Sequence, residues 1–159
     1  AIESGNVGIG TTGPVSLLEI SKSAAGALGP ELTLTNPSNG TGDQMAISFK
    51  SGSYVRSSIT STVADNGATY SSDLNFLTVP TYNGTLTSRL FIQGNNGNVG
   101  IGMTAPTAAL HLPVSSTARA SLCIPAGTAP TIPVAGDVWV EGAVLKFYNG
   151  TTTKEIAVV

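Results

Sequence analysis

Gly5-Asn6-Val7-Gly8-Ile9-Gly10-Thr11-Thr12-Gly13-Pro14 opens a segment, residues 5–20, that the chain of 159 residues contains twice. The second copy, residues 97–112, begins Gly97-Asn98-Val99-Gly100-Ile101-Gly102 and lies at a constant offset of 92 positions, from Gly5 to Gly97. The shared Gly-Asn-Val-Gly-Ile-Gly core and the matching Thr, Pro and Leu that follow mark an internal repeat. We call residues 5–20 and 97–112 the two copies of the glycine-rich element.

The composition of the element predicts a short strand. Val and Ile alternate with Gly, so one face of such a strand is apolar and the other carries no side chain. Glycine inside a strand usually marks the close approach of another backbone. Three chains converging on a common axis would account for that approach, and so would a glycine-rich hairpin inside a monomeric sandwich. After Thr-x-Pro turns the chain, a period-2 apolar pattern resumes at Leu18 and Leu110.

The region between the copies has the alternating apolar pattern of β-strands, with β-branched and aromatic residues at the apolar positions. Asn-Gly pairs, the strongest short-range hairpin signal, begin at residues 39, 66, 83, 96 and 149. Three of these pairs precede Thr and so match a glycosylation acceptor pattern, but the turn alone accounts for them. Strands are expected around residues 32–34, 47–49, 54–63, 74–76 and 90–92.

The last third of the chain opens with Ile124–Pro133, where three prolines predict an extended linker or a sheet edge. Cys123, just before it, is predicted to be a small apolar strand residue. Residues 136–159 are predicted to form a β-meander that turns at Glu141-Gly142 and Asn149-Gly150. A unit this small cannot bury enough apolar area to stand alone. The predicted units are 1–28, 29–96, 97–122, 123–135 and 136–159.

The composition argues against several classes of function. Charged residues make up 10% of the chain, against about 25% in ordinary soluble domains. The seven basic residues are scattered and the net charge is −2, whereas nucleic-acid binding needs a clustered basic face. No apolar run approaches the roughly 20 residues of a membrane span. With one histidine, His111, and nine scattered acids, we predict no catalytic residues, no metal site, no cofactor and no enzyme.

The pattern Gly-Asn-Val-Gly-Ile-Gly-Thr-Thr-x-Pro-x-x-x-Leu resembles a recurrent element of phage tail fibres, tailspikes and related virion appendages. Residues 136–152 resemble a second element of such proteins, and residues 45–52 and 88–92 fit the module between them. The resemblance implies small β-sandwich or β-prism-like modules in series, intertwined as a parallel homotrimeric fibre. In that family the element often precedes a self-cleaving intramolecular chaperone, which residues 1–159 do not contain.

The function expected from this resemblance is that of a structural segment of a phage tail or head fibre, located in the virion and supporting attachment to a host cell. Its partners would be copies of itself, other appendage proteins and a host-surface glycan. The alternative is an adhesin or carbohydrate-binding module of a bacterial extracellular protein. The expected oligomer interface consists of Val7, Ile9, Val99, Ile101, Trp139 and Phe147. The expected receptor contacts are Tyr54, Tyr70 and Tyr82.

Overall fold

The computed structural model describes residues 2–3, 5–26, 28–38, 40–65, 67 and 70–156. None of the described residues is helical, and the described strands form three sheets, so the predicted all-β fold is confirmed. The strands are β1 Ile2–Glu3, β2 Asn6–Ile9, β3 Leu18–Ile20, β4 Gln44–Ser51, β5 Tyr54–Val63, β6 Ser72–Thr78, β7 Thr87–Ile92, β8 Val99–Ile101, β9 Leu110–His111, β10 Ala126–Gly127, β11 Val138–Glu141, β12 Val144–Tyr148 and β13 Thr153–Ile156.

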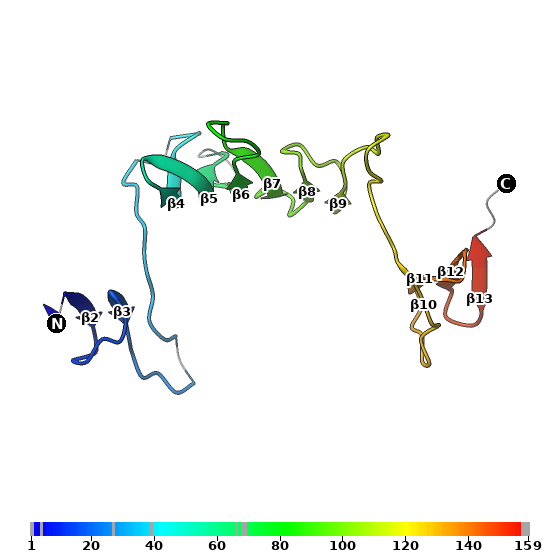
Figure 1. The fold of residues 1–159 in the computed structure, drawn as a ribbon, viewed down its shortest axis with the longest axis horizontal. Coiled ribbons are helices and arrows are strands. Elements are labelled where there is room, and N and C mark those ends of the chain that lie inside the picture. The colour runs from blue at the N-terminus through cyan, green and yellow to red at the C-terminus, as the bar shows by residue number, and fades with distance from the viewer. Residues whose placement is uncertain are drawn as a thin grey trace.

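The largest sheet contains β4 to β9 in chain order (Figure 1). Each strand pairs antiparallel with the next, except that β8 and β9 are parallel. The strands expected around 47–49, 54–63, 74–76 and 90–92 are all present, because each alternating apolar run matches the pleat of a strand. Residues 32–34 belong to no strand, which corrects the strand expected there.

The hairpin connections follow the expected turns in part. Asn83, with φ of 58°, lies in the β6–β7 connection, and Gly97, with φ of 73°, lies between β7 and β8. The β4–β5 connection instead turns at Gly52, which has a φ of 59° and no neighbouring Asn. Asn39 and Asn66 lie outside the described residues. A positive φ, rather than the Asn-Gly pair itself, is what these turns share.

The second glycine-rich element is part of the six-stranded sheet, because β8 pairs with β7. Residues 29–96 and 97–122, expected as separate units, therefore contribute strands to one sheet. The first copy instead forms a small sheet of its own, ordered β1-β2-β3. The same element thus occurs in two different surroundings.

The C-terminal sheet has the order β10-β11-β12-β13. Strands β11, β12 and β13 form the expected antiparallel meander, with the two expected turns. From the proline-rich segment, Ala126 and Gly127 pair in parallel with β11, so part of this segment is a sheet edge. Cys123 is exposed and lies outside the strands, so the strand position expected for it is wrong.

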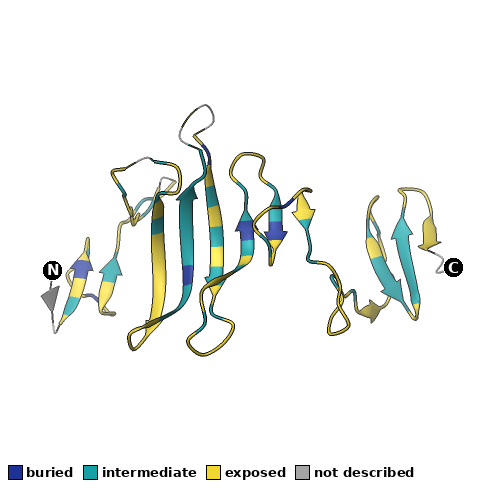
Figure 2. Cartoon of the chain, turned by 90° about the horizontal axis from the view of Figure 1, so that it is seen from above, coloured by how far each residue is buried: buried dark blue, intermediate teal, exposed yellow. Residues whose placement is uncertain are grey.

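No described strand contacts a strand of another sheet. Figures 1 and 2 show each sheet of the described residues as a single layer, with no second sheet stacked on its face. The buried apolar side chains among the described residues are Phe91, at 7% exposed, and the two prolines of the glycine-rich elements, Pro14 and Pro106. The accessible surface is 11176 Å², whereas a compact monomer of 16.0 kDa exposes about 7,400 Å². Most of the apolar surface that these strands could bury remains open to solvent.

Candidate functional site

The register of the six-stranded sheet gathers apolar side chains on one face. Residues paired directly across neighbouring strands project to the same side, and so do residues two apart along a strand. The pairing therefore produces two rows that cross the sheet. One row is Ile47, Ile59, Phe76, Leu90 and Ile101, and the other is Met45, Ser61, Leu74, Ile92, Val99 and Leu110. We call these eleven positions the apolar face.

The opposite face of the sheet is largely polar. On that side, Ser88 donates a hydrogen bond of 2.8 Å to the side-chain oxygen of Asn75, and the Ser58 hydroxyl donates one of 3.1 Å to the Ile47 carbonyl. Phe91 shares that side and pairs with Gly100, which leaves room for its ring. These hydrogen bonds join residues of neighbouring strands within the chain.

The apolar face, by contrast, is open to solvent. Figure 2 shows that β4 is largely exposed and that β5 beside it is mostly of intermediate burial, with Ser58, on the polar face, buried. The most exposed side chains of the face range from 36% to 59% accessible: Ile47, Leu74, Phe76, Ile101 and Leu110. A contiguous apolar patch of this kind on a soluble protein marks an interaction surface or an aggregation hazard.

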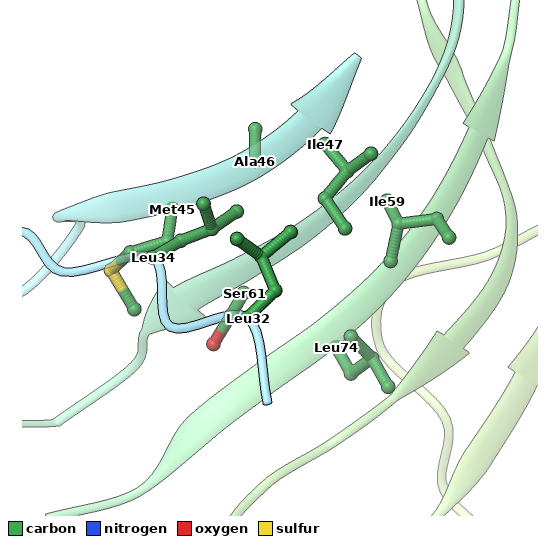
Figure 3. Close-up of a pocket in the computed structure, with 8 residues that line it drawn as sticks. All are labelled: Leu32, Leu34, Met45, Ala46, Ile47, Ile59, Ser61 and Leu74. Atoms are coloured by element: carbon green, nitrogen blue, oxygen red, sulfur yellow. The ribbon is translucent and has the colours of Figure 1, made fainter. Parts of the chain in front are cut away.

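One end of the apolar face is hollowed. A depression of about 240 Å³ lies between the segment carrying Leu32 and Leu34 and strands β4, β5 and β6. In Figure 3, Leu32 and Leu34 lie against Met45, Ile47 and their neighbours, so they flank the sheet instead of extending it. Both leucines remain exposed themselves. The segment therefore adds apolar surface to the face more than it covers it.

Four of the six residues expected at an oligomer interface lie on open apolar surfaces. Val99 and Ile101 belong to the apolar face, where Ile101 is directly paired with Leu90. Val7 and Ile9 occupy the equivalent positions of β2 and are exposed. Sequence reasoning did not assign the other members of the face to the interface. The alternating apolar residues of β4, β6 and β7 could have identified them, if these strands had been aligned side by side instead of considered one at a time.

Trp139 and Phe147 do not share a surface. Trp139 is paired with Lys146, while Phe147 is paired with Val138, one position further along each strand. Because side chains alternate along a strand, these two aromatic residues lie on opposite faces of the C-terminal sheet. A single flat interface on this sheet can therefore contain one of them but not both.

The close approach at the interior glycines that the two copies share, Gly8 and Gly100, is made by the same chain. A Cβ atom at Gly8 would lie 2.7 Å from the carbonyl oxygen of Thr11, and one at Gly100 would lie 2.8 Å from that of Met103. The turn that follows each short strand folds back over the glycine. The interior glycine therefore requires neither three converging chains nor a hairpin, and the element is a parallel strand–turn–strand unit.

Each turn of the element is held by the asparagine that precedes the strand's valine. Asn6 donates a hydrogen bond of 3.1 Å from its side-chain nitrogen to the carbonyl oxygen of Pro14, and Asn98 donates one of 3.2 Å to that of Pro106. The carbonyl of a proline turn is thereby satisfied without a second chain. This hydrogen bond explains why the asparagine and the proline both recur in the two copies of the element.

His111 has a structural contact of its own. Its Nδ1 accepts a hydrogen bond of 3.2 Å from the backbone nitrogen of Thr107. Glu19, the matching residue of the first copy, accepts one of 2.8 Å from the backbone nitrogen of Val15. The two side chains therefore perform the same local task. Among the described residues, no group of three or more His, Cys, Asp or Glu side chains could hold a metal ion.

The three expected receptor-contact tyrosines divide into a pair and a single residue. Tyr54 begins β5 and Tyr82 lies in the β6–β7 connection, and their ring centroids are 6.2 Å apart at 50°. The Arg56 guanidinium carbon lies over both rings, 5.1 Å from the Tyr54 centroid and 5.5 Å from that of Tyr82. Tyr70 precedes β6 in the β5–β6 connection, and because β5 and β6 are antiparallel this connection lies at the end of the sheet opposite to Tyr54 and Tyr82.

Arg56 reaches these rings from a β-bulge. The β4–β5 register pairs Phe49 with Ser57 and Lys50 with Val55, which leaves Arg56 as the extra residue. Arg89 is the extra residue at the second bulge, between β6 and β7. A bulge redirects a side chain and increases the local twist. Both arginines of this sheet are thus displaced from the regular alternation.

Two ion pairs lie in the C-terminal sheet. Lys146 Nζ lies 2.8 Å from a Glu141 carboxylate oxygen and 3.8 Å from one of Glu155. The hydrogen bond from Lys146, with its charge, lowers the pKa of Glu141 below its ordinary value of 4.5. The same bond raises the pKa of Lys146 above 10.5. Neighbouring Trp139 has a buried indole nitrogen without a hydrogen-bond partner.

Comparison with models of known protein families and with curated proteins finds no match to this chain. The resemblance to virion appendages therefore rests on the sequence patterns themselves: the glycine-rich element, the C-terminal pattern and the fit of residues 45–52 and 88–92. In the part of the chain that the structure describes, there is no helix that could cross a membrane.

Proposed function

We propose that this chain is a structural segment of a virion fibre that associates with copies of itself, as a homotrimer, through the apolar face of its six-stranded sheet. The observation that carries the proposal is the exposure of that face. Its rows run across the whole sheet, and ten of its eleven positions are apolar, Ser61 being the exception. Burying such a face against an equivalent face removes apolar area from water, at roughly 25 cal/mol per Å².

The size of the open surface supports association with large partners. The chain exposes about 3,800 Å² more than the roughly 7,400 Å² of a compact monomer of its mass. A standard interface buries roughly 800 Å² on each partner, and obligate complexes bury considerably more. Association with two further copies would cover an excess of this size. Three single-layer sheets that face one another would also build the prism-like arrangement expected from the sequence.

The low charge of the chain fits the same role. Charged residues make up 10% of the sequence, so copies of the chain repel one another weakly. In a fibre, the segment would hold an attachment site at a distance from the particle, and several copies would raise the avidity of weak contacts. A monomeric adhesin or carbohydrate-binding module is the competing function. It predicts the mass of a single chain in solution, whereas the fibre segment predicts the mass of three.

Light scattering on the purified chain, coupled to size-exclusion chromatography, tests the proposal. We expect three times the chain mass of 16.0 kDa. The substitution Ile47→Asn places an amide on the apolar face at a position already 43% exposed in the single chain, so it should dissociate the assembly while leaving the chain folded. Ser48→Asn, one residue further and on the opposite face, is the matched control. A monomeric wild-type mass would contradict the homotrimer and favour the adhesin.

A further inference from the structure

We propose that Tyr54, Arg56 and Tyr82 form a binding site for a sugar that bears a carboxylate. The three side chains come from two separate parts of the chain, the start of β5 and the β6–β7 connection. The guanidinium of Arg56 lies over both rings. Nothing in the alternation of the strands requires this arrangement, since Arg56 stands at a bulge.

The charge of Arg56 is not matched within the chain. Among the described residues, no carboxylate pairs with it and its contacts are the two rings. Arg89, at the other bulge, differs because its Nε donates a hydrogen bond of 2.7 Å to the Thr78 hydroxyl. An arginine offers five donors in a planar fork that matches a carboxylate in two places. Arg56 thus holds donors available for an anion.

The two rings supply the second half of the recognition. Tyr82 is 76% exposed and Tyr54 is 47% exposed. The face of an aromatic ring carries partial negative charge, whereas the C–H groups on one side of a pyranose ring carry partial positive charge, so the two stack favourably. A uronic-acid or sialic-type sugar combines such a C–H face with a carboxylate on the same ring. A neutral sugar would leave the guanidinium unmatched.

The rigidity of the arrangement favours binding. The backbone carbonyl of Arg56 accepts a hydrogen bond of 3.0 Å from the nitrogen of Val79, which ties the bulge to the start of the connection that carries Tyr82. Stacking on two rings further restricts the guanidinium. Less ordering is then required when a ligand binds. The proposal does not depend on trimerisation, which would multiply the number of sites.

The test is isothermal titration calorimetry of the intact chain with an oligomer of glucuronic acid. The equivalent glucose oligomer and acetate are titrated as comparisons. We expect weak binding of the glucuronate oligomer only. Arg56→Gln should weaken it by about tenfold, as expected for loss of a charge-assisted pair. Tyr82→Ala should weaken it by about threefold to tenfold, the range for loss of a stacked ring.

Two matched controls separate the cluster from general effects. Tyr70→Ala removes a tyrosine that is 77% exposed at the other end of the sheet, and Arg89→Gln removes an equal charge from the other bulge. Both should bind like the wild type. Equal losses in Tyr70→Ala or Arg89→Gln, equal binding of the glucose oligomer or of acetate, or no binding at all would each overturn the site. The mass of every sample is measured alongside, so a failed site is distinguished from a failed assembly.

Discussion

The two copies of the glycine-rich element share a parallel strand pair, a turn and an asparagine hydrogen bond, but they lie in different surroundings. In the first copy Val7 pairs with Leu18, and in the second Val99 pairs with Leu110, at the same offset of 92. The asparagine-to-proline hydrogen bond recurs at 3.1 and 3.2 Å. The second copy, however, is joined to a long antiparallel sheet, whereas the first belongs to a three-stranded one.

This difference shows which interactions belong to the element and which come from its neighbours. The parallel pairing, the fold-back over the interior glycine and the asparagine clamp are the same in both copies, so local sequence is sufficient to specify them. The neighbouring strands differ, because β2 pairs with β1 whereas β8 pairs with β7. Substitutions at equivalent positions can therefore separate local from contextual stability.

The largest effect is expected at the interior glycines. Gly8→Val and Gly100→Val each force a side chain against a turn carbonyl, and overpacking of this kind costs about 1–3 kcal/mol. Gly100→Val should be the more damaging in thermal unfolding followed by circular dichroism, because its strand joins β7 to β9. Gly13→Ala is the control, since the second copy already has Ala105 at that position. Unchanged unfolding in Gly100→Val would show that the turn does not close over the glycine.

The glycines at the ends of the two short strands should differ from each other. Gly10 and Gly102 both have a positive φ, at 77° and 67°, so alanine costs about 1–2 kcal/mol at either. A Cβ at Gly10 would also meet the Ser21 carbonyl, whereas at Gly102 it meets nothing within 4 Å. Gly10→Ala should therefore be the more destabilising in denaturant titration. Equal losses of stability in Gly10→Ala and Gly102→Ala would mean that the contact with the Ser21 carbonyl does not distinguish the first copy from the second.

The asparagine clamps should contribute equally. Asn6→Ala and Asn98→Ala each remove one side-chain hydrogen bond to a proline carbonyl, worth about 0.5–1.5 kcal/mol. The double variant should lose the sum of the two, because the sites are distant. The comparison is made on midpoints of urea unfolding. A loss in only one of the copies would show that surroundings, not local sequence, hold the turn.

Exchanging Glu19 and His111 should have a smaller effect. Each accepts a hydrogen bond from the backbone nitrogen four residues earlier, so Glu19→His and His111→Glu should each change stability by less than about 0.5 kcal/mol. Glu19→Ala and His111→Ala, which remove the acceptor, should cost more than the exchanges. If the exchanges are as costly as the alanine variants, the two residues are not equivalent.

The C-terminal sheet contains no copy of the element and serves as the reference region. Its stability should depend on pH and should not change with substitutions in the two copies. The lowered pKa of Glu141 means that its stabilising contribution is present at neutral pH and is lost as the pH falls below 4.5. The raised pKa of Lys146 means that its contribution is lost as the pH rises above 10.5. Unfolding followed by the fluorescence of Trp139, the only tryptophan, should show a small loss of stability below pH 4.5 and another above pH 10.5. Lys146→Met should flatten them, and substitutions in the two elements should not alter them.

The sequence was sufficient to predict most strands. The alternation from Tyr54 to Val63 marked β5 at both ends, and Glu141-Gly142 located a hairpin turn. It was misleading at Leu32 and Leu34, whose alternation suits an extended segment beside a sheet as well as a strand within it. Hydrogen-bonded pairing is a long-range property, so a local period cannot distinguish the two. The membership of β8 in the large sheet depended on pairing for the same reason.

The candidate sites were only partly predictable. Val99 and Ile101 could be found on an apolar face from local alternation, but Trp139 and Phe147 were separated by a register that composition does not reveal. Tyr54 and Tyr82 could be named as exposed aromatic residues. Their contact with Arg56 depends on a bulge, and an extra residue in one strand leaves no mark in the sequence until the partner strand is known.

The self-closing turn of the glycine-rich element has a consequence for inheritance. The two copies share Gly-Asn-Val-Gly-Ile-Gly at an offset of 92 residues, so unequal exchange between two genes within this stretch would delete or duplicate 92 residues. Every product of such an exchange would still contain a complete strand, turn and clamp at the junction, because these contacts are local. The element is thus a position at which the chain can be shortened or lengthened by one whole repeat of 92 residues while the turn at the junction stays complete.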